Sequence, residues 1–107
     1  MEPIFRESII ALSSGRLPSG VAVVRMSGPH VRFALETIVG SVPTPRMATL
    51  CTLREAGRPI DSGLAVFFPG PASFTGEDIA EFHLHGGKAV VGALLAALTR
   101  ISGVRLA

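Results

Sequence analysis

One short segment of this 107-residue chain restricts its fold more than any other. Between Ala80 and Leu84, apolar and polar residues alternate strictly, which is the pattern of a β-strand with one buried face. The apolar residues of this strand would face a core. The opposite face would carry one carboxylate and two imidazoles, from Glu81, His83 and His85. Because a double glycine follows at once, the segment predicts a polar ligand surface that ends in a turn.

The remaining apolar segments predict the rest of the element order. We expect strands over residues 8–12, 21–26, 47–54, 64–68 and 104–106, in addition to the strand described above. A helix should open at Ser27-Gly28-Pro29 and end at Gly40, and a second should cover residues 88–101. The wholly apolar segment 64–68 predicts a central strand. This order indicates an α+β domain, a mixed β-sheet with two main helices packed on one face.

Composition limits the classes of partner. The chain is 48% hydrophobic and 17% charged, so little charge covers its surface, and part of that surface should meet a partner. Ten Lys and Arg against eight Asp and Glu leave a net charge of +2, which is too small to indicate nucleic-acid binding.

The sequence also predicts a location in the cell. Cys51 is the only cysteine, so no internal disulfide can form, which fits a reducing cytoplasm. The acidic, mixed start, residues 1–7, does not have the pattern of a signal peptide. The longest apolar run, residues 89–98, is about half a membrane span. We therefore expect a soluble, cytoplasmic protein without a membrane partner.

The second predicted helix is apolar around most of its circumference. Such a helix is either deeply buried or shared with a partner, and the sequence leaves both alternatives open. The chain ends at Ala107, directly after the strand-like segment 104–106. We therefore expect it to be a fragment of a longer protein.

Two charged side chains are the candidates for binding. Glu81 offers two acceptor oxygens side by side, which match a ligand with two adjacent N–H donors, such as a guanidinium or the amino edge of a pterin. Arg25 ends an otherwise apolar strand and needs a partner, either internal or bound. The alternatives are a solvated strand face for Glu81 and an internal Arg25–Glu81 ion pair, which the sequence does not exclude.

Other polar groups carry weaker signals. His83 and His85 could both reach one metal ion, but no third ligand has a recognisable spacing, so we expect no metal site. His85 would instead fix the turn or line a pocket. Gly86-Gly87-Lys88 lacks the pattern of a phosphate-binding Walker loop, and no nucleophile–base set is visible, so we expect no catalytic residue.

Several blocks of sequence, taken in order, resemble one known family. They are Gly15-Arg16, residues 20–29 (GVAVVRMSGP), Phe68-Pro69-Gly70-Pro71, residues 73–78 (SFTGED), Glu81 and His85-Gly86-Gly87. This set is similar to the N-terminal domain of the tRNA modification GTPases of the MnmE (TrmE) family. The resemblance covers nearly all 107 residues.

The resemblance implies a fold and a function. It implies that residues 1–107 form a domain with the folate-binding fold of aminomethyltransferases, which binds 5-formyl-tetrahydrofolate and forms a homodimer. Helical and GTPase domains, with sites for GTP, potassium and magnesium, would lie outside this chain. The full protein would act with an MnmG-type flavoprotein on tRNA, adding an aminomethyl or carboxymethylaminomethyl group at C5 of the wobble uridine.

The resemblance also assigns residues. The family's folate contacts fall on Arg25 and Glu81, with further contacts expected downstream of Ala107, and the segment itself would be non-catalytic. Two rival interpretations stay open: a purely structural dimerisation module, and a fragment of a folate-dependent aminomethyltransferase-like enzyme. A Gly-x-x-x-x-Gly-Lys-Ser/Thr motif further along the gene would exclude the second rival.

The chain departs from the family pattern at two places. The family often has Gly-Arg-Gly-Gly in its first loop, where this chain has Leu17-Pro18-Ser19 after Gly15-Arg16. The family also often has Gly-His-Gly-Gly, where this chain has Leu84 before His85. We expect both changes to stiffen or fill places where the backbone could approach a ligand.

Overall fold

The computed structural model describes residues 6–107 and consists of one six-stranded sheet with two helices. Residues 1–5, most of the segment on which the signal-peptide expectation rested, lie outside the described residues. The elements, in chain order, are β1 Ser8–Leu12, β2 Ser19–Ser27, α1 Val31–Ile38, β3 Thr49–Glu55, β4 Arg58–Phe68, β5 Ile79–Gly86, α2 Lys88–Thr99 and β6 Val104–Leu106. The predicted α+β class and element order are confirmed.

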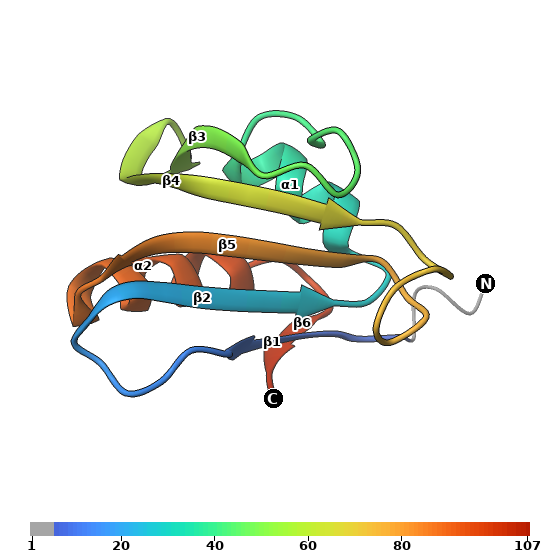
Figure 1. Cartoon of the computed structure of the whole chain (residues 1–107), viewed down its shortest axis with the longest axis horizontal. Helices are drawn as coiled ribbons and strands as arrows, with labels where there is room; N and C mark the ends of the chain where they lie inside the picture. The colour runs from blue at the N-terminus through green and yellow to red at the C-terminus, as the bar shows by residue number, and fades with distance from the viewer. Residues whose placement is uncertain (1–5) are drawn as a thin grey trace.

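The sheet is mixed, as predicted. Its strand order is β3-β4-β5-β2-β1-β6, and every neighbouring pair is antiparallel except β1 and β6, which are parallel. The apolar end of β4 lies between β3 and β5, so this strand is internal, although it is second from the edge of the sheet and not at its centre as predicted. Both helices cover the same face of the sheet and lie behind the strands in Figure 1. We call this the helix face and the opposite one the open face.

The core lies between the helix face and the two helices. Its largest fully buried side chains include Phe67, Phe82, Ile10, Met26, Leu35, Leu94 and Leu98. The apolar stripe predicted for the first helix is confirmed, because the buried residues of α1 are Val31, Ala34, Leu35 and Ile38. Gly40, at φ +99°, ends this helix by donating its N–H to the carbonyls of Leu35 and Glu36.

The second helix uses one side for the core. Val91, Leu94, Ala97 and Leu98 are buried against the sheet. After Lys88, which begins the helix, the exposed positions are Ala89, Gly92 and Ala93, which carry little or no side chain. None of the large exposed hydrophobic residues found within 6–107 lies on α2. The exposed part of the apolar circumference of α2 therefore consists of small residues. The large apolar residues of the helix pack into the core, which is the first of the two alternatives that the sequence left open.

Two predicted boundaries were wrong. The chain turns at Ala56-Gly57, so β4 begins at Arg58, well before the predicted start at Leu64, and already contains Pro59. The proline is tolerated because β4 pairs with β5 only from Leu64 onwards, which leaves one edge of the strand unpaired at Pro59. Ser27 belongs to β2 and does not cap α1, whose N-cap is His30.

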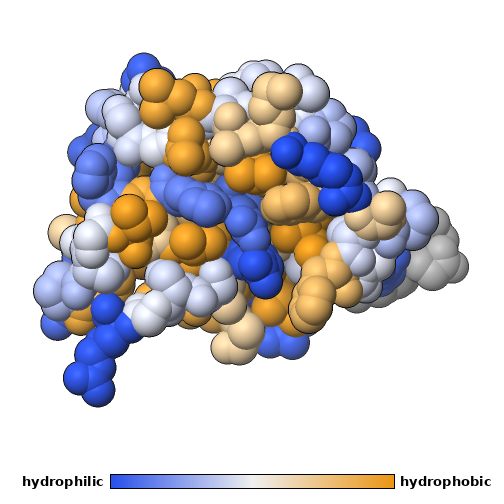
Figure 2. All heavy atoms as spheres, in the orientation of Figure 1, coloured by the Kyte–Doolittle hydropathy of each residue, from blue (hydrophilic) through white to orange (hydrophobic). Residues whose placement is uncertain are grey.

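The open face is a set of cross-strand rows with alternating chemistry. One row runs Ala11–Arg25–Glu81–Val66, and its neighbour on one side runs Val23–His83–Leu64–Leu50. Figure 2 shows this face, where hydrophobic patches surround a hydrophilic strip. Several large apolar side chains are exposed on it, namely Ile9, Val21 and Leu50. The helices leave this apolar surface uncovered.

Candidate ligand-binding site

Arg25 and Glu81 lie directly opposite each other on β2 and β5. The alternation predicted for β5 is confirmed, because Ala80, Phe82 and Leu84 are at most 3% exposed while Glu81 points to the open face. The neighbours of the pair in its row, Ala11 and Val66, are apolar, so within the row each of the two charges has only the other as a charged neighbour. The sheet register thus explains why these two side chains meet.

The two side chains form an ion pair, the internal alternative that the sequence had left open. Arg25 donates to Glu81 Oε2 from Nη2 at 2.6 Å and from Nε at 3.1 Å. His83, from the same strand as Glu81, lies with its Nε2 3.1 Å from Glu81 Oε1. The carboxylate side chain is 17% exposed and the guanidinium side chain 42%, so solvent and ligands still reach the pair.

The surroundings keep Glu81 ionised. Partial burial opposes the charged form, but hydrogen bonds from Arg25 and then from His83 outweigh it, and the pKa of Glu81 falls below its ordinary value. At neutral pH the residue is therefore a carboxylate that only accepts hydrogen bonds.

Counting acceptor sites shows what a ligand would have to displace. A carboxylate oxygen has about two lone-pair sites. Oε2 uses both on Arg25, and Oε1 uses one on His83. A ligand with two adjacent N–H donors therefore binds both oxygens only if Arg25 turns away from Oε2.

Hollows lie on both sides of Arg25. One, of about 320 Å³, lies beside Glu81, and Phe68, Phe74 and Arg46 form part of its wall. The other, of about 420 Å³, extends over Ile9 and Ala11 on β1. Arg25 lines both hollows.

The loop between β4 and β5 forms the rim of the first hollow. Asp78 Oδ1 accepts a hydrogen bond from the Gly70 N–H at 2.9 Å, and Thr75 and Ser27 share a hydroxyl contact of 2.8 Å. Ser73 Oγ donates to the carbonyl of Glu77. These bonds tie an irregular loop to the ends of β2 and β5, which places the ring of Phe74 beside the pair.

The two histidines of β5 have different partners. His83 lies beside Glu81, whereas the main-chain N–H of His85 donates to Asp61 Oδ2 at 2.8 Å and its Nδ1 lies 2.9 Å from the same oxygen. Burial opposes ionisation of Asp61, but the bonds from His85 and from the Ser62 main chain outweigh it and lower the pKa of Asp61. His85 is thus fixed at the turn. No group of three metal-ligating side chains occurs within residues 6–107.

Comparison with known proteins assigns the chain to a family. The family described as "GTP-binding protein TrmE N-terminus" matches residues 8–107. The chain belongs to this TrmE N-terminus family. A relative from Brucella anthropi, named tRNA modification GTPase MnmE, is 68% identical over 103 residues, which cover 95% of this chain and 23% of that protein. A relative of the same name from Brucella abortus is 61% identical over 104 residues, which cover 96% of this chain and 24% of that protein.

The chain spans about a quarter of the length of these curated relatives. Its resemblance to the N-terminal domain of the MnmE family is confirmed. Within the described part of the chain, no helix is both long and apolar enough to cross a membrane.

The departures from the TrmE pattern have other consequences than expected. Leu84 is 3% exposed and faces the helices, so it fills the core and not the ligand surface. Leu17 likewise packs against the core. Gly86, in contrast, is required by close approach, because a Cβ there would lie 2.2 Å from the carbonyl oxygen of Ser19.

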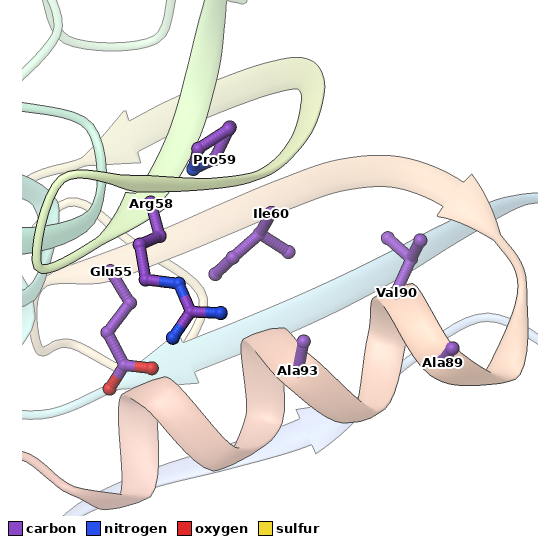
Figure 3. A pocket seen from close by; sticks show the side chains of 7 residues that line it. All are labelled: Glu55, Arg58, Pro59, Ile60, Ala89, Val90 and Ala93. Atoms are coloured by element: carbon purple, nitrogen blue, oxygen red, sulfur yellow. The ribbon is translucent and has the colours of Figure 1, made fainter.

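A further hollow, of about 360 Å³, lies away from the pair, between α2 and the β3–β4 hairpin. Figure 3 shows Ile60, Val90 and Ala93 around it, with Glu55 and Arg58 at one end. The carboxylate of Glu55 is bonded there by Arg100 at 2.7 Å. No residue predicted as a site lies in it.

The sequence analysis missed two residues near the polar side chains of β5, namely Asp61 and Arg46. Asp61 is 24 positions from His85 in the sequence, and Arg46 lies in the irregular segment between α1 and β3. Asp61 had one signal, an acid inside an otherwise uncharged strand, from Pro59 to Phe68. Arg46 had none, because no local pattern shows that it lies beside Glu81 in space.

Proposed function

We propose that this chain is the folate-binding, dimerising N-terminal domain, residues 1–107, of a cytoplasmic tRNA modification GTPase. The names of the Brucella relatives support the GTPase and tRNA parts of this proposal. The helical and GTPase domains, with GTP, potassium and magnesium, would lie in the remaining length that such relatives have. An MnmG-type flavoprotein would be the partner in modifying C5 of the wobble uridine, and this segment would bind without catalysing.

The Arg25–Glu81 pair between two hollows is the observation that carries the folate proposal. The pterin ring of 5-formyl-tetrahydrofolate has adjacent 2-amino and N3–H donors on one edge and a carbonyl oxygen beside them. The donors match the ionised carboxylate of Glu81, and the oxygens match the guanidinium of Arg25. Residues of this chain therefore match both the N–H donors and the oxygen acceptor of the pterin ring.

Binding would exchange one set of partners for another. Arg25 would leave Glu81 Oε2 and contact a ligand oxygen, while both Glu81 oxygens accept from the ring. The ion pair keeps both charges satisfied in the absence of ligand, so neither is left buried and unpaired. Phe74, which lines the same hollow and is exposed, offers a ring face for stacking on a planar ligand.

Calorimetric titration of the full-length protein with 5-formyl-tetrahydrofolate tests the proposal. Glu81→Gln should weaken binding by about 1–3 kcal/mol, because one charge-assisted acceptor is lost, which corresponds to roughly 5- to 150-fold in Kd. Glu55→Gln is a matched control, since Glu55 also pairs with an arginine but lines the distant hollow between α2 and the β3–β4 hairpin.

The outcomes separate the alternatives. Absence of binding by the wild-type protein, with all sequence after residue 107 retained, would overturn the folate proposal and favour the structural module. Binding by the wild type that is equally strong in Glu81→Gln would keep the ligand but remove Glu81 from its site.

The open face supports the homodimer part of the proposal. It presents Val21 and Leu50, which are 59% and 77% exposed, on a surface that neither helix covers. Exposed apolar patches of this kind mark interaction sites. A second copy would cover them and, at the same time, close the hollows around Arg25.

A further inference from the structure

Arg46 is a second arginine at the hollow beside Glu81, and its backbone is unusual. It has φ +64°, a left-handed conformation that residues with a Cβ rarely adopt. Such conformations persist where the surrounding structure holds them in place, and they cluster at ligand sites. Here the Arg46 N–H donates to the carbonyl of Phe67 at 2.7 Å, at the end of β4.

The side chain of Arg46 is held over the hollow by two contacts. Its Cζ lies 5.8 Å from the centre of the Phe68 ring, and its Nη2 donates to the carbonyl of Ala72 in the rim loop. Phe68 and Ala72 both line the hollow next to Glu81. The guanidinium is therefore positioned before any ligand arrives.

The charge balance of this hollow leaves Arg46 available. Among residues 6–107, Glu81 is the one carboxylate that lines it, and Arg25 already occupies Oε2 of that group. Within residues 6–107, no carboxylate forms an ion pair with Arg46, whereas Arg6, Arg32, Arg100 and Arg105 each have one. A guanidinium has five N–H donors, and Ala72 uses one.

We propose that Arg46 binds an oxygen acceptor of the ligand whose N–H edge is held by Glu81. This inference rests on the proposed folate function and extends it by one binding residue. Two groups of oxygens in 5-formyl-tetrahydrofolate have the required chemistry: the carbonyls on or attached to the pterin ring, and the carbonyl and carboxylates of the p-aminobenzoyl-glutamate tail. Arg46 supplies N–H donors for an oxygen, and Glu81 supplies acceptors for N–H groups. Together they select a planar ligand that has both oxygen acceptors and N–H donors.

The test uses Arg46→Gln and Arg46→Lys in the full-length protein, with calorimetric titration of 5-formyl-tetrahydrofolate. Arg46→Gln should raise Kd about tenfold or more, as expected for loss of a charge-assisted hydrogen bond. Arg46→Lys keeps the charge but not the forked geometry, so its Kd should lie between those of the wild type and Arg46→Gln. Arg58→Gln is the matched control, because Arg58 is also exposed and lines the hollow beside α2.

A tail-free reduced pterin that keeps the formyl group, 5-formyl-6-methyl-tetrahydropterin, separates the two oxygen sources. If Arg46→Gln weakens both ligands, the contact is to the ring or its formyl group. If it weakens only the folate, the contact is to the p-aminobenzoyl-glutamate tail, and a smaller salt dependence of folate binding would assign it to a carboxylate of that tail.

Two results would overturn the inference in distinguishable ways. Unchanged folate affinity in Arg46→Gln, while Glu81→Gln loses affinity, would leave folate binding intact and make Arg46 structural. No folate binding by the wild type would overturn the proposed function and this inference with it. Thermal unfolding of each variant shows whether a loss of affinity comes from a disturbed rim loop. In that case the unfolding temperature of Arg46→Lys would be as low as that of Arg46→Gln.

Discussion

At the scale of single residues, two carboxylates of the sheet bind neighbouring side chains, on their own strand or on the adjacent one. Glu81 holds Arg25 and His83, and Asp61 holds both the main chain and the ring of His85. Both carboxyl groups have a lowered pKa because these hydrogen bonds outweigh the effect of burial. Each group therefore stabilises the fold in its ionised form.

Asp61 makes this stabilisation depend on pH. Because its folded pKa lies below the ordinary value of 3.8, its contribution is complete above that value and is lost as the pH falls through the folded pKa. Asp61→Asn should lower the free energy of unfolding at neutral pH by about 0.5–1.5 kcal/mol. The difference from wild type should shrink in urea unfolding at pH values below 3.8.

Glu36→Gln provides the control for this experiment. Glu36 is exposed on α1, and it forms no ion pair with the residues that the structure describes. A difference for Asp61→Asn that stayed constant across the pH range would show that ionisation of Asp61 does not stabilise the fold.

At the scale of elements, close backbone contacts decide where β4 and β5 meet. Gly63 precedes Leu64, where the pairing of β4 with β5 begins, and a Cβ at Gly63 would lie 2.1 Å from the carbonyl oxygen of His83. Gly92, inside α2, has no atom within 4 Å of the corresponding position. The same chemical change should therefore have opposite effects at the two glycines.

Gly63→Ala should destabilise the chain by about 1–3 kcal/mol, because the strands must separate to accept the methyl group. Gly92→Ala should stabilise it by roughly 0.5–1 kcal/mol, since alanine is the better helix former. Thermal or urea unfolding of the two variants checks both signs. Equal effects would mean that β4 and β5 do not approach so closely at His83.

At the scale of the whole molecule, the helices cover one face of the sheet and leave the other for a partner. Val21 is exposed on the open face, and Phe33 is exposed to a similar extent on α1, at 59% and 58%. If the open face is the homodimer interface, a charged residue in place of Val21 should prevent association, and a charged residue in place of Phe33 should not.

Val21→Lys is therefore expected to shift the full-length protein from dimer to monomer, while Phe33→Lys leaves it dimeric. A lysine in the interface would have to lose its hydration without a partner. Analytical ultracentrifugation over a range of concentrations measures the change. A wild-type protein that is monomeric throughout, or a Val21→Lys variant that dimerises as the wild type does, would refute the proposed interface.

The sequence alone determined the elements, because their signals are local. Alternation in β5, the apolar stripe of α1 and the apolar run at the end of β4 each follow from side-chain periodicity over a few residues. The same alternation identified the exposed side of Glu81. The motif blocks around Arg25 and Glu81 identified the family, which the match to residues 8–107 confirmed.

Tertiary structure alone decided which of these side chains meet. Register pairs Arg25 with Glu81 across 56 positions, and it brings Asp61 to His85 across 24. The left-handed backbone of Arg46 carries a third charge to the same hollow from a segment without a local pattern. Contacts between distant segments depend on strand order and register, and no periodicity within one segment records them.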